Sequence, residues 1–216
     1  MGGTGATGKS RSFNDRMRTV NKDQFLQWAS TKGLGLNPKY PQSAVLHFLA
    51  TSDSRFWEIP PQPERRPSFL ASLIDLMGDW QTCYVWRHLG NWPDPKHIDA
   101  RRINDAVELL ILKGLGLPLG TGAVVEFARN EREALVTLLF STTVFGWSVG
   151  EDLYVVPDHA RQILQTDHHN VVHASFADTE DLERWTSRMS KKGFELPREP
   201  PDATFKRPAW MDGGDR

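Results

Sequence analysis

Residues 151–176, EDLYVVPDHARQILQTDHHNVVHASF, decide how the rest of the chain is interpreted. The stretch is rich in strand-favouring residues and is divided by two groups of turn-forming residues. Pro157 ends the first run because proline has no backbone N–H for a sheet ladder. Residues 167–170, DHHN, supply the second turn. The stretch therefore predicts a three-stranded meander with strands at 153–156, 162–166 and 171–176.

The third of these strands alternates in character along its length. Side chains of a strand point to opposite faces in turn, so Val172, Ala174 and Phe176 share one face. Val171, His173 and Ser175 share the other face. We expect the apolar face to pack against the core.

Predicted helices flank the meander on both sides. Asn130 with Glu133 has the pattern of a helix cap, and a strand at 123–127 precedes it. After the meander, Leu182, Trp185 and Met189 form the apolar stripe of a helix that starts near residue 178. The predicted order after residue 120 is β-α-β-β-β-α. The fold class is α+β, with a mixed or antiparallel sheet and helices packed mainly on one face.

The N-terminal half gives shorter signals. Asn21 is predicted to cap a helix that ends at Gly33. A strand is expected at 44–50 and contains His47, which we interpret as a hydrogen-bonded core histidine. Further expectations are an irregular extended segment at 58–67, a helix capped by Ser68 and ended by Gly78, a strand at 82–89, and a helix at 99–113 ended by Gly114.

Composition shifts suggest the domain limits. Residues 1–20 are predicted to form a flexible basic arm, and residues 197–216 a proline-rich tail packed on the body. Residues 21–196 then form a single α+β domain. The Gly- and Pro-containing segment LGLPLGTG at 115–122 leaves open a division into two lobes, 21–117 and 121–196.

Charge and cysteine content exclude several classes of protein. The net charge of −1 gives no support to a nucleic-acid partner or to an acid-rich scaffold, so we expect neither nucleic acid nor nucleotide as a partner. The single cysteine, Cys83, rules out an internal disulfide framework and suits a reducing compartment. No leader segment or long apolar run is evident, so we expect a cytoplasmic protein without a membrane partner. Eight tryptophans could form a binding surface, but core packing is the favoured interpretation.

Residues 3–10, GTGATGKS, match the phosphate-loop pattern GxxxxGK[ST]. Such a loop normally leaves a buried strand and enters a helix, so that its backbone N–H groups can cradle phosphate. Only Met1 and Gly2 precede this copy, and no apolar stripe follows it. We therefore expect a flexible segment that binds no nucleotide, and no cofactor is predicted.

The candidate site lies at the second turn of the meander. Asp167, His168, His169 and His173 are the residues that could converge there to bind a ligand. Asp158 and His159 belong to the other turn, roughly 17 Å away for five residues at ~3.3 Å each. The alternative is a capped turn beside an exposed His173, and no metal site is predicted, because zinc usually needs four converging ligands.

The function that best fits these features is a non-catalytic binding or interaction protein with another protein as its partner. The alternative is a metal-dependent or general-base hydrolase centred on Asp167, His169 and His173. The sequence has no Gly-x-Ser-x-Gly elbow, His-Glu-x-x-His helix or Cys-x-x-Cys pair. Whether the chain is an enzyme therefore stays open, with the balance against it.

Overall fold

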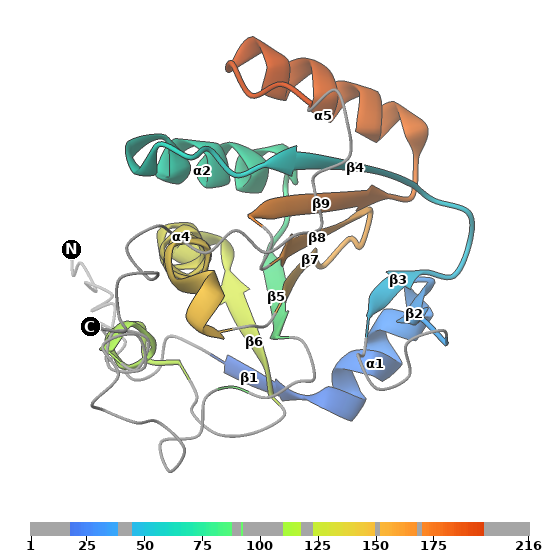
Figure 1. Ribbon diagram of the computed structural model, residues 1–216. Helices are drawn as coiled ribbons and strands as arrows, with labels where there is room; N and C mark the ends of the chain where they lie inside the picture. Colours follow the sequence, from blue (N-terminus) through green and yellow to red (C-terminus); the bar gives the residue numbers. More distant parts are fainter. Residues whose placement is uncertain are drawn as a thin grey trace, which may run out of the picture.

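The computed structural model describes residues 18–38, 45–87, 92, 110–117, 123–149, 152–167 and 170–196. Its centre is a seven-stranded antiparallel sheet with the strand order β1-β6-β5-β7-β8-β9-β4 (Figure 1). The strands are β1 Arg18–Asn21, β4 Asp53–Glu58, β5 Thr82–Arg87, β6 Ala123–Ala128, β7 Leu153–Pro157, β8 Gln162–Asp167 and β9 Val171–Phe176. Of the two predicted alternatives, the antiparallel one is confirmed.

Three long helices cover one face of this sheet (Figure 1). They are α2 Arg66–Leu76, α4 Arg132–Val149 and α5 Thr179–Lys191. The opposite face carries α1 Lys22–Thr31 and a small hairpin of β2 Leu34–Leu36 and β3 Leu46–Phe48. The predicted α+β class, with helices mainly on one face, is confirmed.

The meander forms as predicted, with each strand within one residue of its expected limits. Asn170 closes the second turn with φ +62°, a left-handed conformation that asparagine tolerates well. The first turn contains Ala160 with φ +52°, a position that no glycine signal marks. Together with β6, α4 and α5, the three strands give the predicted β-α-β-β-β-α order.

The helix-side core is built around Trp185 of α5. Its indole packs edge-on against Phe176 of β9, with 5.1 Å between ring centroids, and lies 6.5 Å from Trp57 of β4. Val172 and Ala174 of β9 are buried in the same cluster. The apolar face predicted for the third strand of the meander is therefore the face that packs on the helices. Full burial of a side chain such as Phe176 or Val172 stabilises a fold by about 1.5–3 kcal/mol.

The first helix shows its predicted cap. Asn21 accepts a hydrogen bond from the backbone N–H of Asp23 at 2.8 Å, and the chain leaves α1 through Gly33 with φ +75°. On the inner side of α1, Phe25 and Ala29 are buried against the sheet. The helix therefore forms the second, smaller core on the far face of the sheet.

Three local predictions are wrong in their limits. Ser68 does not cap its helix: a 3₁₀ turn at Pro63–Arg65 leads into α2 at Arg66, where proline lies in the first turn, and the Ser68 hydroxyl donates to the Arg65 carbonyl. The segment predicted as irregular contains the end of β4 and this 3₁₀ turn.

The third correction concerns the start of α4. A 3₁₀ turn at Arg129–Glu131 precedes the helix, and the Glu131 carboxylate accepts the Ala128 N–H at 2.8 Å. The cap therefore lies before Asn130, because the glutamate that bonds back to the chain is Glu131 and not Glu133.

Two strands of the sheet carry no sequence prediction. β1 begins at Arg18, inside the 1–20 segment interpreted as an arm, and pairs with β6. β4 pairs with β9 at the other edge. The sheet takes strands from both 21–117 and 121–196.

Some predicted segments lie outside the described residues, namely 1–17 with the GTGATGKS motif, most of the predicted helix at 99–113, and 197–216. Residues 110–114 are helical, and the left-handed glycine that follows them is Gly116 (φ +67°), two residues beyond the predicted stop. Within the described ranges, none of the helices combines the length and the apolar character that a bilayer span requires.

Candidate functional site on the open face of the sheet

Asp167 and His173, two of the four predicted site residues, lie in contact. The Nε2 atom of His173 is 3.3 Å from Oδ2 of Asp167. The contact follows from the hairpin register: His173 of β9 faces Gln165 of β8, and Asp167 is two residues further along the same face of β8. His168 and His169 lie outside the described residues.

The histidine belongs to a row of side chains that crosses the sheet. Successive cross-strand partners in this row are Trp86 of β5, Tyr154 of β7, Gln165 of β8, His173 of β9 and Phe56 of β4. We call it the cross-sheet row. It lies on the face opposite to α2, α4 and α5.

Two carboxylates hold the polar members of the cross-sheet row. Asp152 accepts a hydrogen bond from Nε2 of Gln165 at 2.7 Å, and Asp167 contacts His173 as described. Asp152 lies two residues before Tyr154, and Asp167 lies two residues after Gln165. Side chains two residues apart along an extended chain share a face, so both carboxylates project to the face of the cross-sheet row. The amide and the imidazole are therefore held in place by neighbouring side chains.

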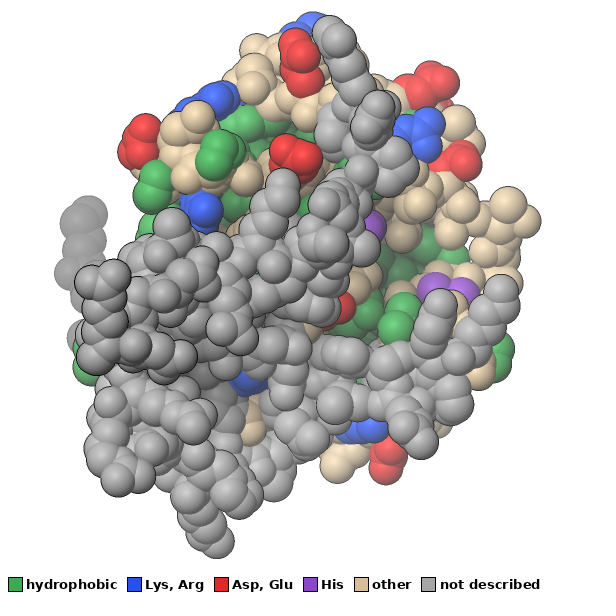
Figure 2. Space-filling model, in the orientation of Figure 1, with side chains coloured by type: hydrophobic (Ala, Val, Ile, Leu, Met, Phe, Trp, Pro, Cys, Tyr) green, Lys and Arg blue, Asp and Glu red, His purple; other side chains and the backbone are tan. Residues whose placement is uncertain are grey.

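Burial decreases along the cross-sheet row. Trp86 and Tyr154 are buried beneath Phe25 of α1 and the small hairpin, whereas Gln165, His173 and Phe56 are partly exposed. The rings of Phe56 and His173 are 6.2 Å apart. Figure 2 shows a hollow with hydrophobic side chains (green) on its floor and histidine side chains (purple) beside them. The outer end of the row, Gln165–His173–Phe56, is the part that a ligand could contact.

Tyr154 lies between the buried and the exposed parts of the row. Burial, followed by the charges of Asp152 and Asp167, raises the pKa of its phenol. Its hydroxyl makes no hydrogen bond with any residue that the structure describes. The phenol therefore stays protonated at neutral pH and can serve as a donor but not as a base.

The contact between Asp167 and His173 bears on a metal site. The separation of 3.3 Å between Nε2 of His173 and Oδ2 of Asp167 is close to that of two ligand atoms which each lie about 2.0–2.2 Å from one tetrahedral zinc ion. In the part of the chain that the structure describes, no group of three or more His, Cys, Asp or Glu residues could hold an ion. The described residues of the predicted site thus supply two zinc ligands, whereas zinc usually takes four.

Cys83 is placed where it cannot act with His173. It lies on β5 and is buried in the helix-side core, on the face of the sheet opposite to the cross-sheet row. Burial, reinforced by the charge of Asp158, raises the pKa of the thiol well above its usual value. The predicted burial of the thiol is confirmed.

The two described histidines outside the predicted site, His47 and His159, bond to backbone groups. His47 lies 2.9 Å through Nδ1 from the Gly35 carbonyl, which confirms the predicted hydrogen bond, but its side chain is only partly buried and not in the core. His159 donates from Nε2 to the Met77 carbonyl at 2.9 Å, and its Nδ1 accepts the Arg161 N–H at 3.2 Å. Asp158 accepts the N–H groups of Gln81 and Thr82. Asp158 and His159 therefore have other partners than the Asp167–His173 pair.

A second polar region was missed by the sequence analysis. A pocket of about 420 Å³ lies between the end of α2, the turn between β7 and β8, and α5. Three arginines line it, Arg161, Arg184 and Arg188, and we call it the arginine pocket. The one sequence signal was the i, i+4 spacing of Arg184 and Arg188 on the last helix. Arg161 comes from a distant turn, which no local pattern connects to that helix.

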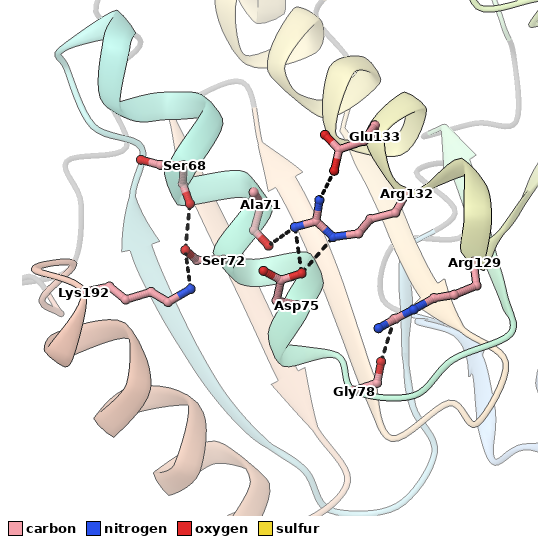
Figure 3. Close-up of polar contacts among 9 residues, drawn as sticks. All are labelled: Ser68, Ala71, Ser72, Asp75, Gly78, Arg129, Arg132, Glu133 and Lys192. Carbon is pink, nitrogen blue, oxygen red and sulfur yellow. Dashed lines mark hydrogen bonds and ion pairs between the residues drawn. The ribbon is translucent and has the colours of Figure 1, made fainter.

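A serine and a lysine also meet on the helix side, as Figure 3 shows. Lys192 donates from Nζ to the hydroxyl of Ser72 at 3.0 Å, and that hydroxyl donates to the Ser68 carbonyl at 2.7 Å. A serine nucleophile needs a base that takes its proton, but here the lysine donates to the serine. The contact therefore links the end of α5 to α2 and is not a catalytic pair.

Comparisons with known proteins identify no relative of this chain. No family model matches it, and searches of curated proteins and of solved structures find no similar protein. The fold and the two polar regions are therefore the basis for any functional argument.

Proposed function

We propose that this chain is a non-catalytic binding protein and that the outer end of the cross-sheet row contacts its partner. The observation that carries the proposal is the arrangement of Gln165, His173 and Phe56 as direct cross-strand neighbours on one face. All three are partly exposed, and the two polar ones are held by carboxylates. A fixed polar pair beside an aromatic ring is a combination suited to specific recognition.

The chemistry of this surface indicates what a partner would present. Phe56 offers an apolar contact, while the imidazole and the amide offer hydrogen bonds beside Asp152 and Asp167. Phe56 also lies on β4, the terminal strand of the sheet. Protein segments often bind by adding to such an edge. The surface therefore suits a protein segment with one apolar side chain and a polar or cationic group next to it.

Affinity capture with matched variants tests the proposal. Wild type, Phe56→Ala and His173→Ala are immobilised beside Glu183→Gln, whose exposed side chain lies on α5 across the sheet. Each variant is first checked for an unchanged melting temperature. We expect a partner protein that wild type and Glu183→Gln retain equally and that Phe56→Ala and His173→Ala lose. The same partner, once purified, should bind wild type directly. Retention of every captured protein by all four would contradict it.

The alternative function is a hydrolase that uses the Asp167–His173 pair as an oriented base. Its support is the direct contact between carboxylate and imidazole, an arrangement that orients general bases in many enzymes. Among the described residues, Cys83 lies on the opposite face of the sheet and Ser72 lies on α2 on that same opposite side, where it accepts a hydrogen bond from Lys192, so neither can be its nucleophile. Hydrolysis of ester or phosphodiester substrates by wild type, abolished in His173→Ala, would favour this function over binding.

A further inference from the structure

The arginine pocket has an excess of positive charge. Asp181 of α5, with only 1% of its side chain exposed, pairs with Arg161 at 2.7 Å and also with Arg184. Arg188 lies one turn further along α5 and forms no ion pair with any described residue. One buried carboxylate thus serves two guanidinium groups, and a third guanidinium stands beside them.

The acidic residues at the rim do not cancel this excess. Asp75 is paired with Arg132 of α4 at 2.7 Å, as Figure 3 shows. Asp79 is the other carboxylate in the lining of the pocket. Arg132 also pairs with Glu133, which does not line the pocket, so the positive excess in the pocket rests on Arg188, which has no carboxylate partner among the described residues.

The end of α2 also borders the pocket, and helix C-termini repel anions through their unpaired carbonyl groups. Here two carbonyls just past the helix already have donors. Arg129 donates to the Gly78 carbonyl, as Figure 3 shows, and His159 donates to the Met77 carbonyl. These donors offset part of the negative charge at the end of α2.

The pocket wall contains a buried amide, the side chain of Gln162. Gln162 is 1% exposed, and its Nε2 lies 3.4 Å from Oδ2 of Asp181. Its carbonyl oxygen has no hydrogen-bond partner within the described part of the chain. Buried acceptors without partners are uncommon in folded proteins. The amide and the arginines together make this wall polar and hold Asp181 from two sides.

We propose that the arginine pocket binds a small anion that carries a carboxylate or phosphate group. Arg188 and the outward N–H groups of Arg161 and Arg184 contact the anion. Asp181 orients the last two guanidiniums, so little side-chain freedom is lost on binding. Guanidinium groups match both anions with paired N–H donors, which is the chemistry that the two candidate ligands share. This site is independent of the cross-sheet row, which lies on the other face.

The test is an NMR titration of the full chain with inorganic phosphate and, separately, with succinate. Sodium chloride keeps the ionic strength constant, so that general screening does not change. Arg188→Gln is compared with Lys191→Gln, since each removes one positive charge from α5 but only Arg188 lines the pocket. We expect saturable shifts at 159–162 and 184–188 for at least one anion, and the anion that binds more tightly identifies the ligand class.

The two variants decide the outcome. Loss of a charge-assisted hydrogen bond should weaken binding about tenfold or more in Arg188→Gln, and Lys191→Gln should remain within about twofold of wild type. Shifts that do not saturate with either anion, or an equal loss of affinity in both variants, would overturn the proposal, because either result describes general attraction to a positive surface.

Discussion

Asp181 and Arg161 form an ion pair at 2.7 Å although the aspartate side chain is almost wholly buried. Arg161 immediately precedes β8, and Asp181 lies in the first turn of α5. The pair therefore fastens the last helix to the turn between β7 and β8. Arg184 and Gln162 contact the same carboxylate, so the aspartate is the centre of a small network.

Asp181→Asn should lower the free energy of unfolding. Removing one partner of a buried pair can cost about 3–5 kcal/mol, but both guanidiniums are about half exposed, so we expect about 1–3 kcal/mol. Glu183→Gln, exposed on the same helix, should change it by less than about 0.5 kcal/mol. Urea unfolding of the two variants measures the difference, and equal stability would show that the network contributes nothing.

Trp185→Ala should destabilise the protein strongly. The indole is fully buried and contacts Phe176 and Trp57, so its truncation should cost about 3–5 kcal/mol. Trp185→Phe keeps a ring at the contact with Phe176 and should recover a large part of this loss. Chemical denaturation of both variants tests the packing. A cost below about 1 kcal/mol for alanine would mean that α5 does not pack on the meander.

Cys83 should make stability depend on alkaline pH. The folded protein raises the pKa of this thiol, so the unfolded chain releases its proton first, near pH 8.5. The stabilisation is complete below that pH and is lost as the pH rises towards the folded-state pKa. Cys83→Ala has no thiol to ionise and does not lose this stabilisation. The difference in unfolding free energy by which it is less stable than wild type should therefore shrink by up to ~1.4 kcal/mol per pH unit.

Unfolding of wild type and Cys83→Ala at pH 7.0, 8.5 and 9.5 measures that deficit. Burial also raises the pKa values of Tyr84 and Tyr154, but unperturbed phenols ionise near pH 10, above most of this window. A deficit that stays constant across the three pH values would contradict a raised thiol pKa.

The meander was predictable because its signals are local. Apolar runs, Pro157 and the turn residues before β9 specify three strands without reference to the rest of the chain. The edge strand β4, DSRFWE, was not predictable, because its outer positions are exposed and therefore polar. Only its pairing with β9 identifies it as a strand, and that partner lies more than a hundred residues away.

The two polar regions differ in the same way. Asp167 and His173 belong to adjoining strands of one hairpin, so a turn and an alternation pattern were enough to predict their proximity. The arginine pocket combines the end of α2, the turn before β8 and α5. These segments are brought together by the packing of α5 on the sheet, and residue spacing along the chain does not predict contacts between distant segments.

We propose that the Asp167–His173 pair belongs to a binding surface and does not hold a catalytic metal. The most direct measurement is the melting temperature of the untagged full chain with and without zinc, for wild type and His173→Ala. An ion bound to the folded state would raise the melting temperature by mass action. We expect the same response to zinc in both proteins. A zinc-dependent rise in wild type that is absent from His173→Ala would contradict it.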